Sequence, residues 1–248
     1  MHFTKLQALG NDYVCLDLTQ ARTGKELSKL ARTLTDRHFG VGGDGLLCVL
    51  PGEGERLRML LYNADGSRGA MCGNGIRCLA AYAWGRGLAK VGHPLEVERD
   101  AGLRVITAVP SGIRAEMGCP VLEKSRRLAA AGQTWRVCPV SMGNPHAVLF
   151  VPHLDNISLE RLGPELESHR AFPDRTNVEV VEVAAPDLLR MRVWERGCGE
   201  TLACGTGACA AFAAAVSSNL AVRRGRVELP GGMLSLDWPA ADGPIYLE

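Results

Sequence analysis

Apolar side chains recur at helical spacing in one stretch of the chain, near its start. From Leu27 to Leu34 they follow the i, i+3, i+4, i+7 rule and predict an amphipathic helix. Two further helices are predicted over residues 75–84 and 205–217. Because residues 208–216 carry no charge to face water, we expect the last helix to be buried, with small side chains that let strands approach it closely. The alternative is an exposed helix of high intrinsic propensity.

Segments of alternating polarity follow the second and third predicted helices. Residues 95–98, 103–109 and 113–117 predict antiparallel strands joined by glycine-containing turns. Residues 227–229 and 234–238 predict a hairpin through Pro230-Gly231-Gly232. Helices and antiparallel strands thus occur in both parts of the chain, which indicates an α+β fold.

Three landmarks of the first part recur in the second at nearly one displacement. Gly10-Asn11 recurs 133 residues later as Gly143-Asn144, and Cys72-Gly73-Asn74-Gly75 recurs 132 residues later as Cys204-Gly205-Thr206-Gly207. Val97-Glu98, before a turn and a strand, recurs as Val227-Glu228. The repeat predicts two domains of one design, residues 1–118 and 119–248, with a charged and weakly patterned crossover over residues 118–132.

Charge and cysteine content narrow the classes of function. A formal net charge of +1, spread along the chain, gives no field that would attract nucleic acid or a membrane surface. The longest apolar run is nine residues, far below the roughly 20 that a membrane span requires. We see no signal peptide, and nine cysteines suit reduced thiols, so a cytoplasmic protein is expected. No Cys-x-x-Cys pair occurs and the histidines are scattered, so no metal site is expected.

Cys72 and Cys204 each stand at the start of a predicted helix. Backbone N–H groups there have no intrahelical partner, and the helix dipole contributes roughly half a positive charge. Such a thiol is expected to ionise more easily than a free one, with a pKa of about 3.5 to 7.5 against about 8.5. The adjoining glycines let a ligand carboxylate approach the amides closely.

Two such thiols, related by a repeat, predict proton exchange at one carbon. If the halves face each other, one thiolate removes a proton from one side and one thiol returns a proton to the other, so the two titrate as a coupled pair. The helix starts stabilise both a carboxylate and the charge that develops on the carbon. No cofactor is then required, and no lysine motif for pyridoxal is present.

The remaining candidate residues have structural interpretations. Arg77 is interpreted as a solvated helix residue, and His146, judged by position alone, as a loop histidine. Residues 40–45 are interpreted as turns, because their spacing lacks the Gly-x-Gly-x-x-Gly of a nucleotide loop. Small apolar core side chains are expected at Cys15, Cys48, Cys78, Cys119, Cys138, Cys198 and Cys209.

Short motifs in a fixed order run along nearly the whole chain. They are Gly10-Asn11-Asp12, residues 38–44, residues 63–67, residues 71–77, residues 141–146, Thr176-Asn177, residues 195–197 and residues 204–208. Together they resemble the diaminopimelate epimerase family. The resemblance implies two pseudo-symmetric domains, each a curled mixed sheet around a central helix, with the active-site cleft between them. It also implies interconversion of LL- and meso-diaminopimelate without a cofactor, in lysine and peptidoglycan biosynthesis, and a homodimer is the oligomer that we consider.

The resemblance also implies roles for individual residues. Cys72 and Cys204 would be the acid and base pair, and His146 and Glu195 would influence their protonation. The carboxylate at the reacting centre would be held at helix-start amides by Gly73, Asn74, Gly205 and Thr206. The rest of the pocket would be lined by Asn11, Asn63, Asn144, Asn177, Glu195 and Arg196, the last suited to grip a distal carboxylate.

Alternative functions stay open at this point. A racemase of another amino acid, such as histidine, is the alternative enzyme, although Asn63, Asn177 and Arg196 suit the distal amino-acid group of diaminopimelate. Outside enzymes, the alternatives are a relative that binds its ligand without turnover and a redox-sensing protein. In the latter, Cys72 and Cys204 would form a reversible disulfide, which requires Cα atoms within about 7 Å.

Overall fold

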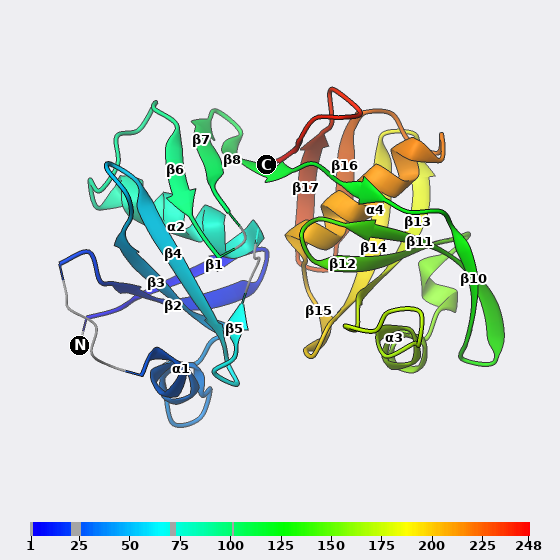
Figure 1. Cartoon of the computed structure of the whole chain (residues 1–248), viewed down its shortest axis with the longest axis horizontal. Helices are drawn as coiled ribbons and strands as arrows, with labels where there is room; N and C mark the ends of the chain where they lie inside the picture. The colour runs from blue at the N-terminus through cyan, green and yellow to red at the C-terminus, as the bar shows by residue number, and fades with distance from the viewer. Residues whose placement is uncertain (1, 21–25, 70–72, 101) are drawn as a thin grey trace. The chain divides into compact units, whose positions relative to one another are not determined.

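The computed structural model describes residues 2–20, 26–69, 73–100 and 102–248. The chain divides into two compact units, Met1–Glu116 and Met117–Glu248 (Figure 1). Each unit combines a mixed sheet with two α-helices, so the α+β class expected from the sequence is confirmed.

The first unit begins with a hairpin of two strands, β1 (Thr4–Ala8) and β2 (Asn11–Asp17). Helix α1 (Leu27–Thr35) follows and leads to β3 (Gly45–Pro51), which is parallel to β2. Next come β4 (Leu57–Asn63), β5 (Arg68–Gly69) and helix α2 (Gly73–Gly85). The unit ends with β6 (Leu95–Glu98), β7 (Arg104–Val109) and β8 (Gly112–Gly118).

The second unit repeats this order after two additional strands, β9 (Val121–Leu122) and β10 (Arg126–Ala130). Its hairpin is β11 (Gln133–Ser141) and β12 (Pro145–Val151), followed by the 3-10 helix η1 (Leu154–Asn156) and α3 (Leu159–Glu167). The central elements are β13 (Asn177–Ala185), β14 (Leu188–Glu195), β15 (Gly199–Thr201) and α4 (Gly205–Ser217). The last strands are β16 (Arg224–Leu229), β17 (Gly232–Asp237) and β18 (Ile245–Leu247).

Strand pairing confirms the internal repeat. In each unit the second and third strands of the repeat are parallel, β2 with β3 and β12 with β13. The fourth and sixth strands are also parallel, β4 with β6 and β14 with β16. The hairpins at the start and the end of the repeat are antiparallel in both units. The faint identity between the two halves therefore corresponds to one topology used twice.

The predicted crossover is more ordered than its sequence pattern indicates. Residues 118–132 contain β9 and β10, which pair with β11. Along β10, Leu128 and Ala130 are buried, whereas Arg127 and Ala129 are exposed. Alanine stands on both faces of this strand, so the alternation of burial leaves only a weak pattern in the sequence.

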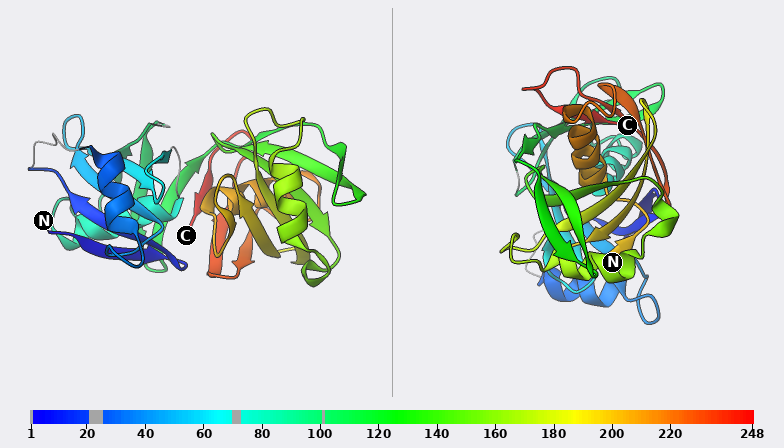
Figure 2. Two further views of the ribbon diagram at one scale, coloured as in Figure 1. Left: turned by 90° about the horizontal axis from the view of Figure 1, so that it is seen from below. Right: turned by 90° about the vertical axis from the view of Figure 1, so that its right-hand side faces the viewer.

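Helix α4 is the buried centre of the second unit. All its residues from Gly205 to Val216 are buried, and it contacts strands β11, β12, β13, β14, β17 and β18. The buried alternative predicted from its composition is therefore the right one. Most of α2 is likewise buried in the first unit. By contrast, α1 and α3 each lie on the outer surface of their own unit, as Figure 2 shows.

An enlarged side chain on α4 tests how closely the strands pack around it. Ala211 is fully buried, so Ala211→Leu is expected to destabilise the second unit by about 1–3 kcal/mol through overpacking. Ser217→Leu, at the exposed end of the same helix, should change stability by less than about 0.5 kcal/mol. Urea unfolding followed by circular dichroism measures both. Equal stability of the two variants would contradict close packing around α4.

Candidate functional site

The start of α2 carries the first predicted group of site residues. Cys72 lies outside the described residues, whereas Gly73 and Asn74 form the first turn of α2. The Nδ2 of Asn74 donates to Asn11 Oδ1 at 3.4 Å. Arg77 donates to Asn74 Oδ1 at 2.9 Å and to the Gly73 carbonyl at 3.3 Å. Arg77 is only 8% exposed, so its interpretation as a solvated residue is wrong: its charge is used inside the unit to orient Asn74.

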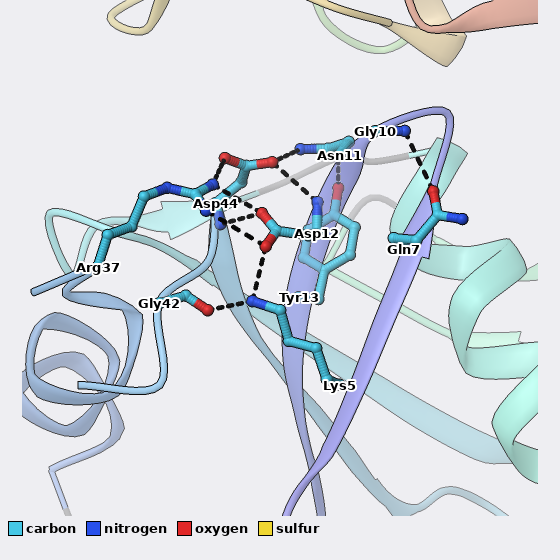
Figure 3. Close-up of polar contacts among 9 residues, drawn as sticks. All are labelled: Lys5, Gln7, Gly10, Asn11, Asp12, Tyr13, Arg37, Gly42 and Asp44. Atoms are coloured by element: carbon cyan, nitrogen blue, oxygen red, sulfur yellow. Dashed lines mark hydrogen bonds and ion pairs between the residues drawn. The ribbon is translucent and has the colours of Figure 1, made fainter.

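Asn11 is fixed by a cluster of charged and polar side chains, drawn in Figure 3. Its Nδ2 donates to Asp44 Oδ2 at 2.7 Å, and the Asp12 amide donates to the same oxygen at 2.8 Å. Its Oδ1 accepts from the Tyr13 hydroxyl. Arg37 in turn bridges Asp12 at 2.7 Å and Asp44 at 2.8 Å. The turn after β1 and the loop before β3 are thereby joined, and Asn11 is held in one amide orientation.

Opposite charges set the ionisation of Asp12. Burial alone would raise the pKa of this carboxyl, but hydrogen bonds and charges from Arg37 and Lys5 outweigh burial and lower the pKa to about 2. Lys5 Nζ lies 2.6 Å from Asp12 Oδ2 and also donates to the Gly42 carbonyl. Asp12 therefore stays ionised at neutral pH, which keeps the cluster around Asn11 intact.

Asn63 has a different environment in the same unit. It ends β4, and its Nδ2 donates to Ser67 Oγ at 2.9 Å across the following turn. The Asn63 amide also donates to the Ser67 carbonyl at 2.9 Å. The turn that leads to β5 therefore fixes Asn63.

Cys204 is the N-cap residue of α4 and is 7% exposed. Its Sγ accepts a hydrogen bond from the Gly207 amide at 3.4 Å and lies 3.5 Å from Thr206 Oγ1. The carboxylate of Glu195, at the end of β14, lies near enough to the thiol to act on its pKa. Thr201 donates to Glu195 Oε1 at 2.5 Å. Glu195 and Cys204, two of the predicted site residues, therefore lie in the same part of the second unit.

The surroundings of Cys204 raise the pKa of its thiol, whereas the sequence analysis expected a lowered pKa. Burial raises the pKa of this thiol well above its ordinary value, and the carboxylates of Glu195 and Glu179 raise it further. The hydrogen bonds from Thr206 and the Gly207 amide act in the opposite direction but do not compensate. Burial also raises the pKa of Glu195. The helix-start argument did not weigh these carboxylates: the resemblance had implied an influence of Glu195 on the thiols, whereas Glu179 was missed.

A chain of hydrogen bonds leads from Cys204 into the core of the unit. Thr206 Oγ1 accepts from Asn144 Nδ2 at 3.3 Å, and Asn144 Oδ1 lies 3.1 Å from His146 Nε2. His146 Nδ1 lies 2.7 Å from Glu179 Oε1, and both side chains are fully buried. His146 is part of β12 rather than of a loop.

The two units repeat part of this network residue by residue. In both, an asparagine after the first strand contacts the second residue of the buried helix: Asn11 meets Asn74, and Asn144 meets Thr206. In both, the oxygen of that asparagine also meets a ring two residues later, on Tyr13 or His146. The repeat therefore preserves the polar contacts of the helix start as well as the topology.

Asn177 and Arg196 form a second contact in the same unit. Asn177 begins β13, donates from Nδ2 to the Pro145 carbonyl at 3.0 Å and accepts the Arg196 amide at 2.9 Å. The exposed Arg196 side chain donates to the Asp174 carbonyl at 3.0 Å. Asn177 thus holds the backbone at Arg196, next to Glu195.

Sequence reasoning missed Glu179, Thr201 and Arg37. For Glu179 a signal existed: it stands two residues after Asn177, so in a strand both side chains point to the same face. Thr201 and Arg37 contact the site from separate segments and had no such signal. Expected core positions are confirmed for Cys15, Cys48, Cys78, Cys138 and Cys209, but Cys119 and Cys198 are exposed.

Among the described residues, no group of three His, Cys, Asp or Glu side chains has a geometry suited to a metal ion. None of the helices in this described part is long and apolar enough to cross a membrane.

The sequence matches a known protein family along most of its length. The model of the family "Diaminopimelate epimerase" matches residues 3–123 and 138–247. The chain is 44% identical to the diaminopimelate epimerase of Moorella thermoacetica, over 100% of this chain and 95% of the relative. It is 45% identical to diaminopimelate epimerase 1 of a Nostoc species, with the same coverage of both chains.

Solved structures of lower identity share the fold. A PhzF-family phenazine biosynthesis protein of Bacillus anthracis aligns with a TM-score of 0.74 at 18% identity, over 99% of this chain and 93% of that one. A probable proline racemase from Agrobacterium radiobacter aligns with a TM-score of 0.74 at 13% identity, over 99% of this chain and 88% of that one. The two-domain fold expected from the sequence is thereby confirmed.

Acid unfolding tests the cluster that fixes Asn11. The folded-state pKa of Asp12, about 2, lies below its ordinary 3.8, so its ionised form stabilises the protein above about pH 4 and this contribution is lost as the pH falls toward 2. The Asp12 side chain is 19% exposed, and the contribution is on the order of 1–2 kcal/mol. In urea unfolding between about pH 2 and 5, Asp12→Asn should reduce the dependence of stability on pH by this amount.

Asp242→Asn is the control for this prediction. Asp242 is an exposed loop residue of the other unit, so its variant should keep the wild-type dependence on pH. An unchanged pH dependence in Asp12→Asn would show that the cluster does not stabilise the fold.

Proposed function

This chain belongs to the diaminopimelate epimerase family, and on that premise we propose that it interconverts LL- and meso-diaminopimelate by proton exchange at the α-carbon through Cys72 and Cys204. The observation that carries the proposal is the position of the Cys204 thiol at the start of a buried helix, where the carboxylate of Glu195 acts on its pKa. Cys72 holds the equivalent position in the sequence repeat. Such a pair acts on opposite faces of one carbon and needs no cofactor.

In this mechanism Cys204 alternates between proton donor and proton acceptor. As a donor it gives its thiol proton to the carbanion carbon, and its raised pKa suits the protonated state that this step requires. As an acceptor it must first be a thiolate, and we assign the removal of its proton to Glu195, the carboxylate that acts on its pKa. Cys72 performs the complementary step in each direction. Every turnover thus leaves the two sulfurs with their protonation states exchanged.

Helix-start amides are the groups that we assign to the carboxylate of the reacting centre. Gly205 and Thr206 form the first turn of α4, and Gly73 and Asn74 form the first turn of α2. N–H groups in such turns have no intrahelical acceptor, and the dipole there favours an anion. The same groups stabilise the additional charge on the carboxylate when the α-carbon loses its proton.

The distal amino-acid group of diaminopimelate distinguishes it from simpler substrates. We assign its recognition to Asn63, Asn177 and Arg196, and we assign Asn11 and Asn144 to the lining of the pocket. Arg196 is supported by its exposed guanidinium and by the hydrogen bond that fixes its backbone to Asn177. The cellular role that follows is lysine and peptidoglycan biosynthesis in the cytoplasm. A homodimer stays a prediction.

Isotope exchange tests the two-thiol mechanism. LL-diaminopimelate incubated with the reduced protein in deuterated water should gain deuterium at the inverted α-carbon. Cys72→Ala and Cys204→Ala should each lower the rate of inversion by about 10²-fold or more, because each removes an acid or base. Cys198→Ala, which removes an exposed thiol, is the control and should keep the wild-type rate. Near-normal inversion by either site variant would refute the mechanism.

Substitution of Arg196 tests the substrate assignment. Lysine keeps the charge but cannot bind a carboxylate through two parallel N–H groups, so Arg196→Lys should raise KM for diaminopimelate about tenfold with a smaller effect on kcat. Arg226→Lys, an exposed arginine of β16, is the matched control. Steady-state kinetics with diaminopimelate, and with histidine and proline as competing substrates, separates the candidates. Faster racemisation of another amino acid would contradict the assignment.

A further inference from the structure

Glu179 is a charged side chain in the core of the second unit, and the packing of this core does not require a charge there. It lies on β13, is fully buried and stands between the buried residues Val178 and Val180. The repeat places Leu47 at the same position of β3, two residues after the strand begins. Leu47 is also fully buried. An apolar side chain can therefore occupy this position of the fold. Burying a carboxylate instead costs desolvation free energy, so its presence requires another explanation.

The contacts of Glu179 lead to His146 and to the surroundings of Cys204. Its Oε1 lies 2.7 Å from His146 Nδ1, whereas its Oε2 has no hydrogen-bond partner among the described residues. A Cβ at Gly207 would lie 2.7 Å from Glu179 Oε1 and 3.3 Å from Cys204 Cβ. The absence of a side chain at Gly207 thus leaves room for the carboxylate beside the thiol.

The proton positions on His146 follow from its two neighbours. In the first unit Asn11 donates from Nδ2 to Asp44, so its Oδ1 is the atom that faces Tyr13. By the repeat, Asn144 has the same orientation and turns its Oδ1 to His146 Nε2, at 3.1 Å. Both ring nitrogens of His146 then face acceptors, and a distance of 2.7 Å to Glu179 suits a charge-assisted bond.

We propose that Glu179 is a positioning residue of the reaction: it keeps His146 protonated on both nitrogens, which orients Asn144 and Thr206 toward Cys204, and it places a negative charge beside the Cys204 thiol. The catalytic part of this inference rests on the proposed function. The charged groups that face Cys204 are Glu195 from β14 and Glu179 from β13, with His146 of β12 behind Asn144. Glu179 thereby favours the protonated, donating form of Cys204.

Two variants separate the charge of Glu179 from its shape. Glu179→Gln keeps the shape and removes the charge, whereas Glu179→Asp keeps the charge and loses a methylene. Alkylation of Cys204 by iodoacetamide is followed against pH, with mass spectrometry that resolves Cys204 from Cys198 and Cys209 within the peptide of residues 197–223. In Glu179→Gln the midpoint of alkylation should fall by about one pH unit, because a nearby like charge is gone. Glu179→Asp should keep the wild-type midpoint.

Glu182→Gln is the matched control, because Glu182 lies on the same strand and pairs with Arg190. It should leave both the alkylation profile and turnover unchanged. In the epimerase assay, Glu179→Gln should lower kcat about tenfold and Glu179→Asp should retain most activity, consistent with loss of an orienting partner. A wild-type midpoint in Glu179→Gln, or a shifted midpoint only in Glu179→Asp, would overturn the proposal in favour of a packing role.

A measurement on the unmodified protein covers the case in which Glu179→Gln does not fold. Nitrogen-15 NMR at neutral pH should show both ring nitrogens of His146 protonated, and a ring with one bare nitrogen would overturn the proposal. Neither alkylation nor NMR needs substrate. If the alkylation and NMR results are as expected but diaminopimelate is not inverted, the proposed function is wrong and the positioning role of Glu179 is supported. If diaminopimelate is inverted but the alkylation profile of Cys204 is the same in Glu179→Gln as in the wild type, the proposed function is supported and the positioning role is wrong.

Discussion

The rest of the site depends on the burial of the first turn of α4. Backbone N–H groups at a helix start have no partner within the helix, so a helix that starts inside a sheet must satisfy them with other groups. Here the Gly207 amide donates to the Cys204 sulfur, and beside it the Thr206 hydroxyl accepts from the side chain of Asn144, which precedes β12. Small residues on all sides of α4 let the strands pack closely around it. The reactive thiol is therefore part of the structural solution for the helix.

The two units use one topology for different chemistry. The same positions hold Tyr13 and His146, or Leu47 and Glu179, in the first and second unit respectively. The apolar leucine shows that the strand after the hairpin tolerates a purely structural side chain, whereas the second unit has a buried ion pair there. One topology with a buried helix start thus carries different titratable side chains in each half.

The sequence predicted most of the architecture and only part of the site. Periodicity and the repeat located α1, α4 and the paired hairpins, because these depend on spacing along the chain. The weakly patterned β10 and the buried Arg77 escaped prediction, because each depends on partners distant in sequence. Arg77 stabilises Asn74 inside the unit, although an arginine on a helix usually faces water. Glu179 was missed although it shares a strand face with Asn177.

The pKa of Cys204 depends on the relative sizes of two opposing effects, the helix start and the buried carboxylates around the thiol. A helix start stabilises an anion by about 0.3–1 kcal/mol, and by about 2 kcal/mol in favourable buried cases. A nearby like charge shifts a pKa by about one to three units, at about 1.4 kcal/mol per unit, and burial adds to this. With Glu195 and Glu179 both beside the thiol, the carboxylates and burial outweigh the helix. Under the proposed function, an ammonium group of the substrate near these carboxylates would reduce their opposition to a thiolate and so help to ionise the sulfur.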